Sequence, residues 1–235
     1  MIRNPIIVAL DVPEPAQALA LATDLASVVG AVKIGSELFT SGGPDIVRQV
    51  RATGASVFLD LKFHDIPNTV AKSVSAAVKL DVQMLTIHTC GGVEMMRAAE
   101  ESAQKTAAAL GRPAPLVLGV TVLTSMDSSD LQEIGLTSDV GCQVERLARL
   151  AVQAGLRGLV CSPHEVVMLR KIVPIDFALI TPGIRPAGPA GDDQKRTMTP
   201  REAMAAGSTW LVIGRPIYAA PVPRTAAASI FQSLA

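Results

Sequence analysis

Three charged residues, Asp60, Lys62 and Asp65, lie within six positions of one another, directly after an apolar run that is typical of a β-strand. Alternate side chains of a strand share a face, so we expect Asp60 and Lys62 to project in the same direction. Pro67 disfavours helical backbone at the residue before it, which places Asp65 in a loop just past the strand. Two carboxylates and an ammonium group are costly to hold together, and this clustering predicts a site of chemistry.

The residue types in this cluster favour one kind of reaction. Neighbouring carboxylates favour the charged form of a lysine. A charged lysine is a poor Schiff-base nucleophile but a good proton donor to a developing carbanion. An adjacent aspartate would also repel a substrate carboxylate and would gain relief when that carboxylate leaves. The cluster therefore indicates carbanion chemistry with a positioned acid, and the cationic neighbour of each carboxylate argues against a metal site.

Two further charges fall in earlier apolar runs: Asp11 ends one of them and Lys33 lies within the next. If these runs are parallel strands, the charges share one face with Asp60, Lys62 and Asp65, and their signs alternate as Asp-Lys-Asp-Lys-Asp. The alternative is a purely structural network of ion pairs. Buried ion pairs stabilise a fold poorly, because desolvation offsets their attraction. A functional array is therefore the preferred interpretation.

The last two predicted strands end in the motifs TPGIRP and IGRP, each with a glycine and an arginine. Gly214 would allow the backbone to approach an anion, and Arg185 and Arg215 could each hold phosphate oxygens through two hydrogen bonds. The Gly- and Pro-rich segment 183–197 includes the amide donor Gln194, and we expect it to act as a lid. The alternative role for Arg215 is a surface ion pair.

Short β-prone runs alternate with Ala-rich amphipathic stretches along the whole chain, a pattern typical of a parallel sheet covered by helices. Eight such runs in 235 residues favour an α/β fold, a single-domain (β/α)₈ TIM barrel over residues 1–235, in which the strand ends form the active-site face. Periodicity alone leaves a doubly wound open sheet as the alternative. The predicted strands are residues 6–10, 31–35, 56–62, 84–88, 116–123, 158–161, 178–181 and 210–213. The predicted helices are residues 15–29, 45–52, 69–80, 93–109, 142–154, 163–171, 200–206 and 223–234.

Composition excludes several classes of protein. The 21 basic residues balance the 21 acidic ones, and only 3% of residues are aromatic, so we expect no nucleic-acid partner. The three cysteines are far apart, which fits reduced thiols better than a disulfide framework or a zinc site. The N-terminus does not resemble a secretory signal, and no apolar run reaches the roughly 20 residues of a membrane span. We therefore expect a cytoplasmic protein that is not membrane-bound.

The motif DLKFHDIPN at residues 60–68, together with Asp11 and Lys33, closely resembles the orotidine 5′-phosphate decarboxylase family. The resemblance extends over essentially the whole chain. It implies a homodimer of (β/α)₈ barrels that needs no cofactor or metal and converts orotidine 5′-phosphate to uridine 5′-phosphate (UMP) and carbon dioxide in de novo pyrimidine synthesis. The other matching motifs are HTCGG, LTS, TPGIR, DDQKR and VIGRPI, at residues 88–92, 123–125, 181–185, 192–196 and 212–217.

The resemblance also implies a role for each charged residue of the array. Lys62 would protonate C6 of the pyrimidine as the carboxylate departs. Asp60 would lie against that carboxylate and hold Lys62. Lys33 would bridge Asp60 and the ribose, and Asp11 would bind a ribose hydroxyl.

The remaining roles implied by the resemblance concern the partner subunit and the rest of the substrate. Asp65 would complete the charged array of the partner subunit, and Thr69 would reach the partner's ribose. Thr124 would lie at the pyrimidine. The phosphate would be held by Arg185, Gln194, Gly214 and Arg215.

Two other functions are the alternatives to this interpretation. The first is a magnesium-dependent phosphosugar enzyme of the hexulose-phosphate synthase and keto-gulonate-phosphate decarboxylase group, which carries Glu where this chain has Lys33. A cation at that position opposes a metal. The second is a non-catalytic barrel that only binds nucleotides, and the intact Asp60, Lys62 and Asp65 argue against it.

Overall fold

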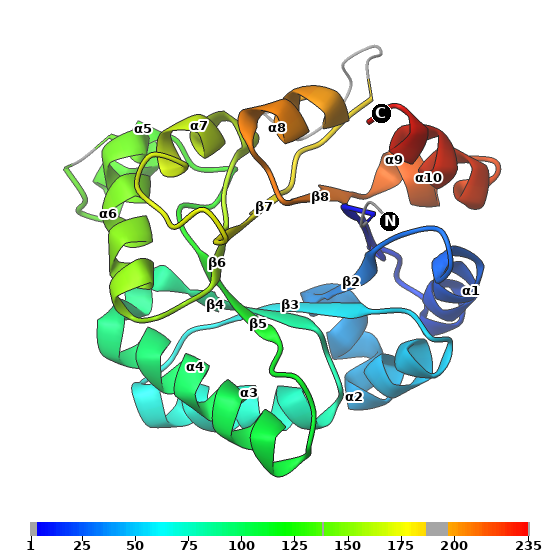
Figure 1. Cartoon of the computed structure of the whole chain (residues 1–235), viewed down its shortest axis with the longest axis horizontal. Coiled ribbons are helices and arrows are strands. Elements are labelled where there is room, and N and C mark those ends of the chain that lie inside the picture. Colours follow the sequence, from blue (N-terminus) through cyan, green and yellow to red (C-terminus); the bar gives the residue numbers. More distant parts are fainter. Residues whose placement is uncertain (1–3, 138, 187–196, 235) are drawn as a thin grey trace.

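Residues 4–137, 139–186 and 197–234 are described by the computed structural model of the chain. Eight parallel strands follow one another around a closed barrel, and β8 pairs with β1 to complete it. Figure 1 shows the strands around the centre and the helices outside them. The closed strand order excludes the open doubly wound sheet, and the predicted single-domain (β/α)₈ barrel is confirmed.

The strands agree closely with the runs predicted from the sequence. The main difference is at the fifth strand, which ends at Val120 rather than at residue 123, so that Thr124 lies in the loop beyond it. The eight strands are β1 (Ile6–Ala9), β2 (Ala31–Gly35), β3 (Val57–Phe63), β4 (Met84–His88), β5 (Leu116–Val120), β6 (Gly158–Val160), β7 (Ala178–Thr181) and β8 (Trp210–Ile213).

The helices include short ones that the sequence patterns did not predict. These are α5, inside the loop after β5, and α9, directly after β8. The helices are α1 (Pro15–Leu25), α2 (Ser36–Ala52), α3 (Pro67–Lys79), α4 (Gly92–Ala109), α5 (Ser128–Glu133), α6 (Val140–Gln153), α7 (Val166–Leu169), α8 (Pro200–Ala206), α9 (Arg215–Tyr218) and α10 (Pro223–Gln232). Two 3₁₀ turns, η1 (Thr89–Gly91) and η2 (Pro163–Glu165), precede α4 and α7.

Local chemistry explains two departures from the predicted helices. The helix predicted at residues 45–52 is the second half of α2, which is kinked where Gly43 has a φ of 59° and Pro44 follows it. The short helix α5 begins with a capping box. The Asp127 side chain accepts hydrogen bonds from backbone amides of the first turn, and the Asp130 side chain accepts one from the Asp127 amide. Such short elements bury little apolar surface and leave no periodic pattern.

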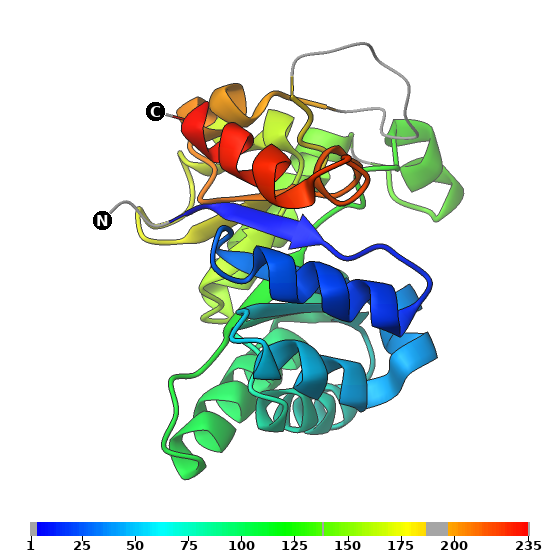
Figure 2. The same ribbon diagram turned by 90° about the vertical axis from the view of Figure 1, so that its right-hand side faces the viewer.

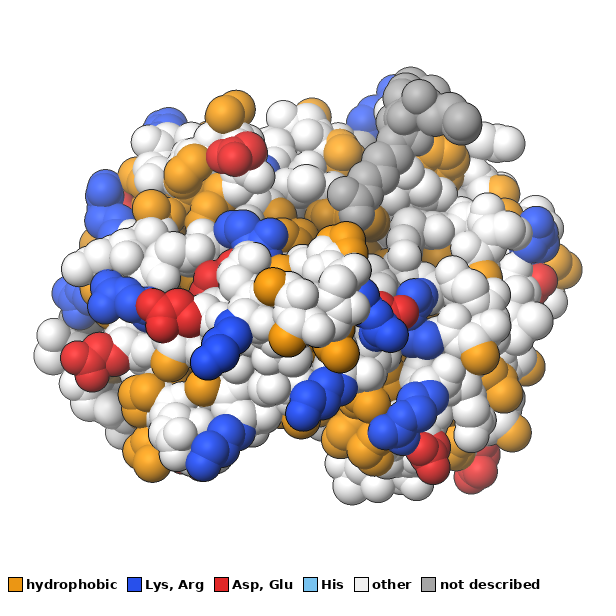
Figure 3. Space-filling model, turned by 60° about the horizontal axis from the view of Figure 1, so that its bottom comes forward, with side chains coloured by type: hydrophobic (Ala, Val, Ile, Leu, Met, Phe, Trp, Pro, Cys, Tyr) orange, Lys and Arg blue, Asp and Glu red, His pale blue; other side chains and the backbone are white. Residues whose placement is uncertain are grey.

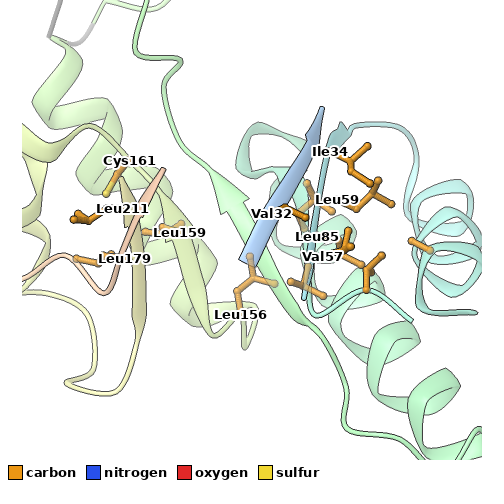
Figure 4. Close-up of a cluster of buried hydrophobic side chains, with 14 of the residues drawn as sticks. Val32, Ile34, Val57, Leu59, Leu85, Leu156, Leu159, Cys161, Leu179 and Leu211 are labelled. Carbon is orange, nitrogen blue, oxygen red and sulfur yellow. The ribbon is translucent and has the colours of Figure 1, made fainter. Parts of the chain in front are cut away.

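Side-chain alternation along the strands divides the core into two layers. Outward-facing side chains such as Val57, Leu59 and Leu85 belong to the layer between the strands and the helices (Figure 4). Inward-facing side chains such as Ala31 and Phe58 fill the barrel. Lys33 and Asp60 are two positions after Ala31 and Phe58, so the same alternation directs both charged side chains into the barrel.

The carboxyl ends of the strands share one side of the molecule because all eight are parallel. In Figure 2 the arrowhead of β1 (blue) points to the right, which identifies that side. The described members of the predicted site lie near the carboxyl ends of the strands or in the segments that follow them, as barrel geometry requires.

Figure 3 draws one face of the molecule with its side chains coloured by type. Basic side chains lie there among acidic, apolar and uncharged ones, without a continuous block of one charge. Among the described residues, no helix combines the length and the apolar character that crossing a bilayer requires.

Candidate active site

A cavity of about 280 Å³ opens at the carboxyl ends of the strands and brings together most of the predicted site residues. One part of its wall is charged, and another is apolar, formed by side chains such as Val120, Val160 and Val212. The predicted residues that line it are Asp11, Lys33, Asp60, Lys62, Thr124, Arg185, Gly214 and Arg215. Asp65 and Thr69 do not line it, and Gln194 lies outside the described residues.

Four charged side chains form a continuous array along the cavity wall. Lys62 Nζ lies 2.9 Å from Asp60 Oδ1, and Lys33 Nζ lies 3.6 Å from Asp60 Oδ2. Lys33 Nζ also donates to Asp11 Oδ1 at 3.1 Å. The predicted alternation of signs is thus present in space for Asp11, Lys33, Asp60 and Lys62, with Asp60 between two cations.

Asp60 has only 13% of its side chain exposed and lies between the two lysines of this array. Burial acts to raise the pKa of its carboxyl group. The charges of Lys33 and Lys62, and hydrogen bonds from Lys62 and Thr86, outweigh burial and hold that pKa below its usual value. Asp60 therefore remains a carboxylate and presents a fixed negative charge to the cavity.

The predicted pairing of Lys62 with Asp60 is present, but regular strand alternation does not explain it. The two residues lie where the pairing of β3 with β4 is irregular. Leu59 pairs with Leu85 and Phe63 with Ile87, so four steps along β3 match only two along β4. Within this bulge Lys62 has a φ of 51°, a left-handed conformation that costs a non-glycine residue about 1–3 kcal/mol. A strained backbone conformation of this kind persists only where the surrounding structure enforces it, and such residues are concentrated at functional sites.

Two residues that the sequence patterns missed lie next to members of the array. Thr86 is fully buried in β4 and donates its hydroxyl hydrogen to Asp60 Oδ1 at 2.9 Å. Gly35 ends β2, and a Cβ there would lie 3.1 Å from Lys33 Nζ, too close for comfortable contact. For Thr86, the inward parity with Met84 in β4 was the available signal.

Arg185, in the loop after β7, and Arg215, the first residue of α9, both line the cavity. Arg185 Nη1 donates to the carbonyl of Ile184 at 3.0 Å, which fixes the side chain against its own backbone. Gly214 separates β8 from α9 and lines the same wall. Two guanidinium groups beside a glycine can together hold a doubly charged phosphate.

The predicted lid falls largely on residues that the structure does not describe. Residues 187–196, which include Gln194, lie outside the described ranges. The residues that flank this segment are hydrogen-bonded to each other. Ile184 and Met198 form a parallel β-bridge, and the Arg185 amide donates to the Met198 carbonyl at 3.0 Å.

Asp65 lies in the loop between β3 and α3, and Thr69 lies in the first turn of α3. Both are exposed, and Asp65 Oδ1 accepts a hydrogen bond from the Ile66 amide at 2.6 Å. Within the described part of the chain, Asp65 makes no ion pair. The neighbouring Ile66 is 66% exposed, which is unusual for a large apolar side chain. Neither Asp65 nor Thr69 lines the cavity of its own chain.

His64, His88 and Cys90 lie together beside the charged array. The two imidazole rings are 5.6 Å apart between centroids, and Cys90 Sγ is 3.8 Å from His64 Nε2. Burial lowers the pKa of His88, and His64 and Lys62 lower it further against the opposing effect of Asp60. Burial raises the pKa of the Cys90 thiol, which opposes its activation as a nucleophile.

The described residues contain no group of three or more His, Cys, Asp or Glu side chains placed to hold a metal ion. The carboxylates of the cavity, Asp11 and Asp60, each face a lysine instead.

The chain is similar to known proteins over nearly its whole length. A family described as orotidine 5′-phosphate decarboxylase / HUMPS matches residues 4–230. The chain is 52% identical over 229 residues to the orotidine 5′-phosphate decarboxylase of Opitutus terrae, covering 97% of each protein. It is 50% identical over 229 residues to that of Moorella thermoacetica, covering 97% of this chain and 91% of the relative.

A solved structure is similar over nearly the same length. The crystal structure of orotidine 5′-phosphate decarboxylase from Lactobacillus acidophilus matches with a TM-score of 0.87 and 37% identity, covering 98% of this chain and 99% of the other. The family model spans almost all of the chain, and the identities to the two sequence relatives extend over almost their whole length. The chain therefore belongs to the orotidine 5′-phosphate decarboxylase / HUMPS family.

Proposed function

We propose that this chain is a carboxy-lyase that converts orotidine 5′-phosphate to UMP and carbon dioxide in pyrimidine biosynthesis. The family of the chain and its relatives named as decarboxylases support the reaction. One observation carries the mechanism: Lys62 Nζ lies 2.9 Å from the buried Asp60 carboxylate, inside a cavity that Arg185 and Arg215 also line.

The cavity suits a substrate with one charged end and one reacting end. Its arginines, Arg185 and Arg215, bind the phosphate with the Gly214 backbone, and Gln194 adds an amide donor. Asp11 and Lys33 bind the ribose hydroxyls. Thr124 lies beside the pyrimidine ring, which packs against the apolar part of the cavity wall. The reacting carboxylate then points to Asp60 and Lys62.

Decarboxylation breaks the bond between C6 and the carboxylate carbon and leaves the electron pair on C6. The Lys62 ammonium group donates its proton to C6 as this charge develops, and the neutral amine regains a proton from solvent. Asp60 stays ionised because its pKa is lowered, so it repels the substrate carboxylate and that repulsion disappears as carbon dioxide leaves. The array thereby favours the transition state over the bound substrate without a cofactor.

We further propose that the working unit is a homodimer with shared sites. Asp65 and Thr69 are exposed and do not line the cavity of their own chain, while Ile66 between them is an apolar contact available to a second copy. In such a dimer, Asp65 extends the array of the partner subunit and Thr69 reaches the partner's ribose.

A decarboxylation assay with and without chelator tests the reaction and the metal-dependent alternative together. We expect loss of orotidine 5′-phosphate absorbance and formation of UMP at the same rate in excess EDTA, because Lys33 occupies the position where a metal ligand would be needed. Activity that vanished in EDTA and returned with magnesium would favour the phosphosugar-enzyme alternative. Absence of UMP formation by folded dimer would favour the nucleotide-binding barrel.

Replacing Arg215 with alanine is expected to weaken UMP binding by about 1.5–3 kcal/mol, the usual contribution of a hydrogen bond to a charged group. Uridine, which lacks the phosphate, should bind wild type and variant alike. The measurement is calorimetric titration of both ligands. Arg48→Ala is the matched control, since Arg48 is an exposed arginine on α2 that pairs with Asp45. Unchanged UMP affinity in Arg215→Ala would remove Arg215 from the phosphate site.

A further inference from the structure

The Thr86 hydroxyl makes two hydrogen bonds, and both go to the reacting part of the array. Its oxygen accepts from the Lys62 backbone amide at 2.9 Å, and its hydrogen is donated to Asp60 Oδ1 at 2.9 Å. A carboxylate only accepts hydrogen bonds, so the hydroxyl must donate to Asp60, which leaves a lone pair for the Lys62 amide. Asp60 Oδ1 also accepts from Lys62 Nζ, so the three groups close a ring.

Thr86 lies opposite the bulge of β3, where ordinary strand pairing is lost. Its neighbours in β4, Leu85 and Ile87, pair with Leu59 and Phe63, the residues on either side of the bulge. The Lys62 amide therefore bonds to the Thr86 side chain. Because threonine is branched at Cβ, its χ1 angle is stiff and the hydroxyl is held in place.

Other buried threonines near the site behave differently. Thr89 donates to the carbonyl of Val120 at 2.7 Å, and Thr121 donates to that of Val160 at 3.3 Å. Both satisfy their hydroxyls on the backbone of a neighbouring strand, which is the ordinary arrangement for a buried threonine. Thr86 makes its bonds to the strained residue and to the buried carboxylate instead.

We infer that Thr86 is a positioning residue for the decarboxylation: it holds Lys62 in its left-handed conformation and fixes Asp60 beside the Lys62 ammonium group. This inference rests on the proposed function and deepens it. Thr86 is fully buried and does not line the cavity, so it is not placed to touch the substrate. It acts through the two residues that do line the cavity.

The test compares Thr86→Val, which keeps the shape but removes the hydroxyl, with Thr86→Ser, which keeps the hydroxyl. We expect Thr86→Val to lower kcat by roughly 10- to 100-fold, the equivalent of one hydrogen bond to a charged group. UMP affinity should stay within about threefold, because UMP lacks the carboxylate that the array acts on. Thr86→Ser should retain most of the wild-type kcat. Steady-state kinetics, UMP titration and thermal melting of the full-length protein measure these quantities.

Thr89→Val is the matched control, since it also removes a buried hydroxyl bond from the same region. It should lower the melting temperature and leave kcat unchanged. If Thr86→Val does not fold, Thr86→Ser is compared with Thr86→Ala, which differs from it by one oxygen. The variant without the hydroxyl should then have the lower kcat, by the same roughly 10- to 100-fold.

Three results would overturn the inference. The first is a kcat within about twofold of wild type when the hydroxyl is absent, since a hydrogen bond of this kind contributes more than that. The second is a loss of UMP affinity as large as the loss in kcat, which would indicate general damage to the site. The third is a wild-type protein that does not decarboxylate orotidine 5′-phosphate, and this result would remove the proposed function together with the inference.

Discussion

Lys62→Ala is expected to lower kcat by roughly 10⁴-fold, at the upper end of what a positioned general acid contributes. Lys62 is the cation nearest the buried Asp60 carboxylate and stands in the cavity where a carbanion would form. Without it, the carbanion at C6 has neither a proton donor nor a neighbouring positive charge. The same change also removes one of the two lysines that stabilise the Asp60 carboxylate, which leaves Lys33 and the Thr86 hydrogen bond.

UMP binding separates this loss of chemistry from a loss of structure. UMP carries the phosphate, ribose and pyrimidine but not the departing carboxylate, so Lys62→Ala should bind it with nearly wild-type affinity. Lys79→Ala is the matched control, because Lys79 is an exposed lysine at the end of α3. Single-turnover measurements of UMP formation give the rate of the chemical step. A Lys62→Ala protein that retained most of its kcat would contradict the assignment of Lys62 as the acid.

Mixing two inactive variants, Asp65→Ala and Lys62→Ala, is expected to restore activity if the sites are shared. In a heterodimer, the site that combines the normal Lys62 of one chain with the normal Asp65 of the other carries neither change. Random mixing makes about half of the dimers heterodimers, so about a quarter of all sites should be intact. Activity should rise from near zero towards that fraction as subunits exchange.

Asp60→Ala mixed with Lys62→Ala is the control for this experiment. Both residues line the cavity of their own chain, so every heterodimer site would lack one of them and no activity should return. Native mass spectrometry with one chain isotopically labelled verifies that heterodimers form. Verified heterodimers of Asp65→Ala and Lys62→Ala without recovered activity would mean that Asp65 acts within its own subunit.

The fold was predictable because its signals are local and repeated. Each strand is a short run of apolar residues whose alternation separates the barrel interior from the helix-facing layer, and each major helix shows its own amphipathic pattern. The elements that were missed are short ones. The helix α5 depends on the Asp127 cap, and the first half of α2 is separated from the predicted second half by Gly43 and Pro44.

The charged residues of the cavity were also predictable, because the barrel rule brings every strand end to one face. Asp11, Lys33 and Asp60 follow from their places near the ends of β1, β2 and β3. The roles given to individual residues depend on family resemblance, and they stay predictions for the experiments above. Gln194 lies in the undescribed part of the chain, so its contact with phosphate is a prediction as well.

Residue types and spacing alone thus led to the barrel and to the face that holds the cavity, and carbanion chemistry at Lys62 stays a prediction from the same residues. Only the folded chain showed how Lys62 meets Asp60, since the bulge in β3 and the left-handed backbone at Lys62 break the alternation on which the pairing was predicted. It also showed the buried Thr86 between them. A bulge and its hydrogen-bond partner depend on the register of two strands that are distant in sequence, and no local pattern encodes that register.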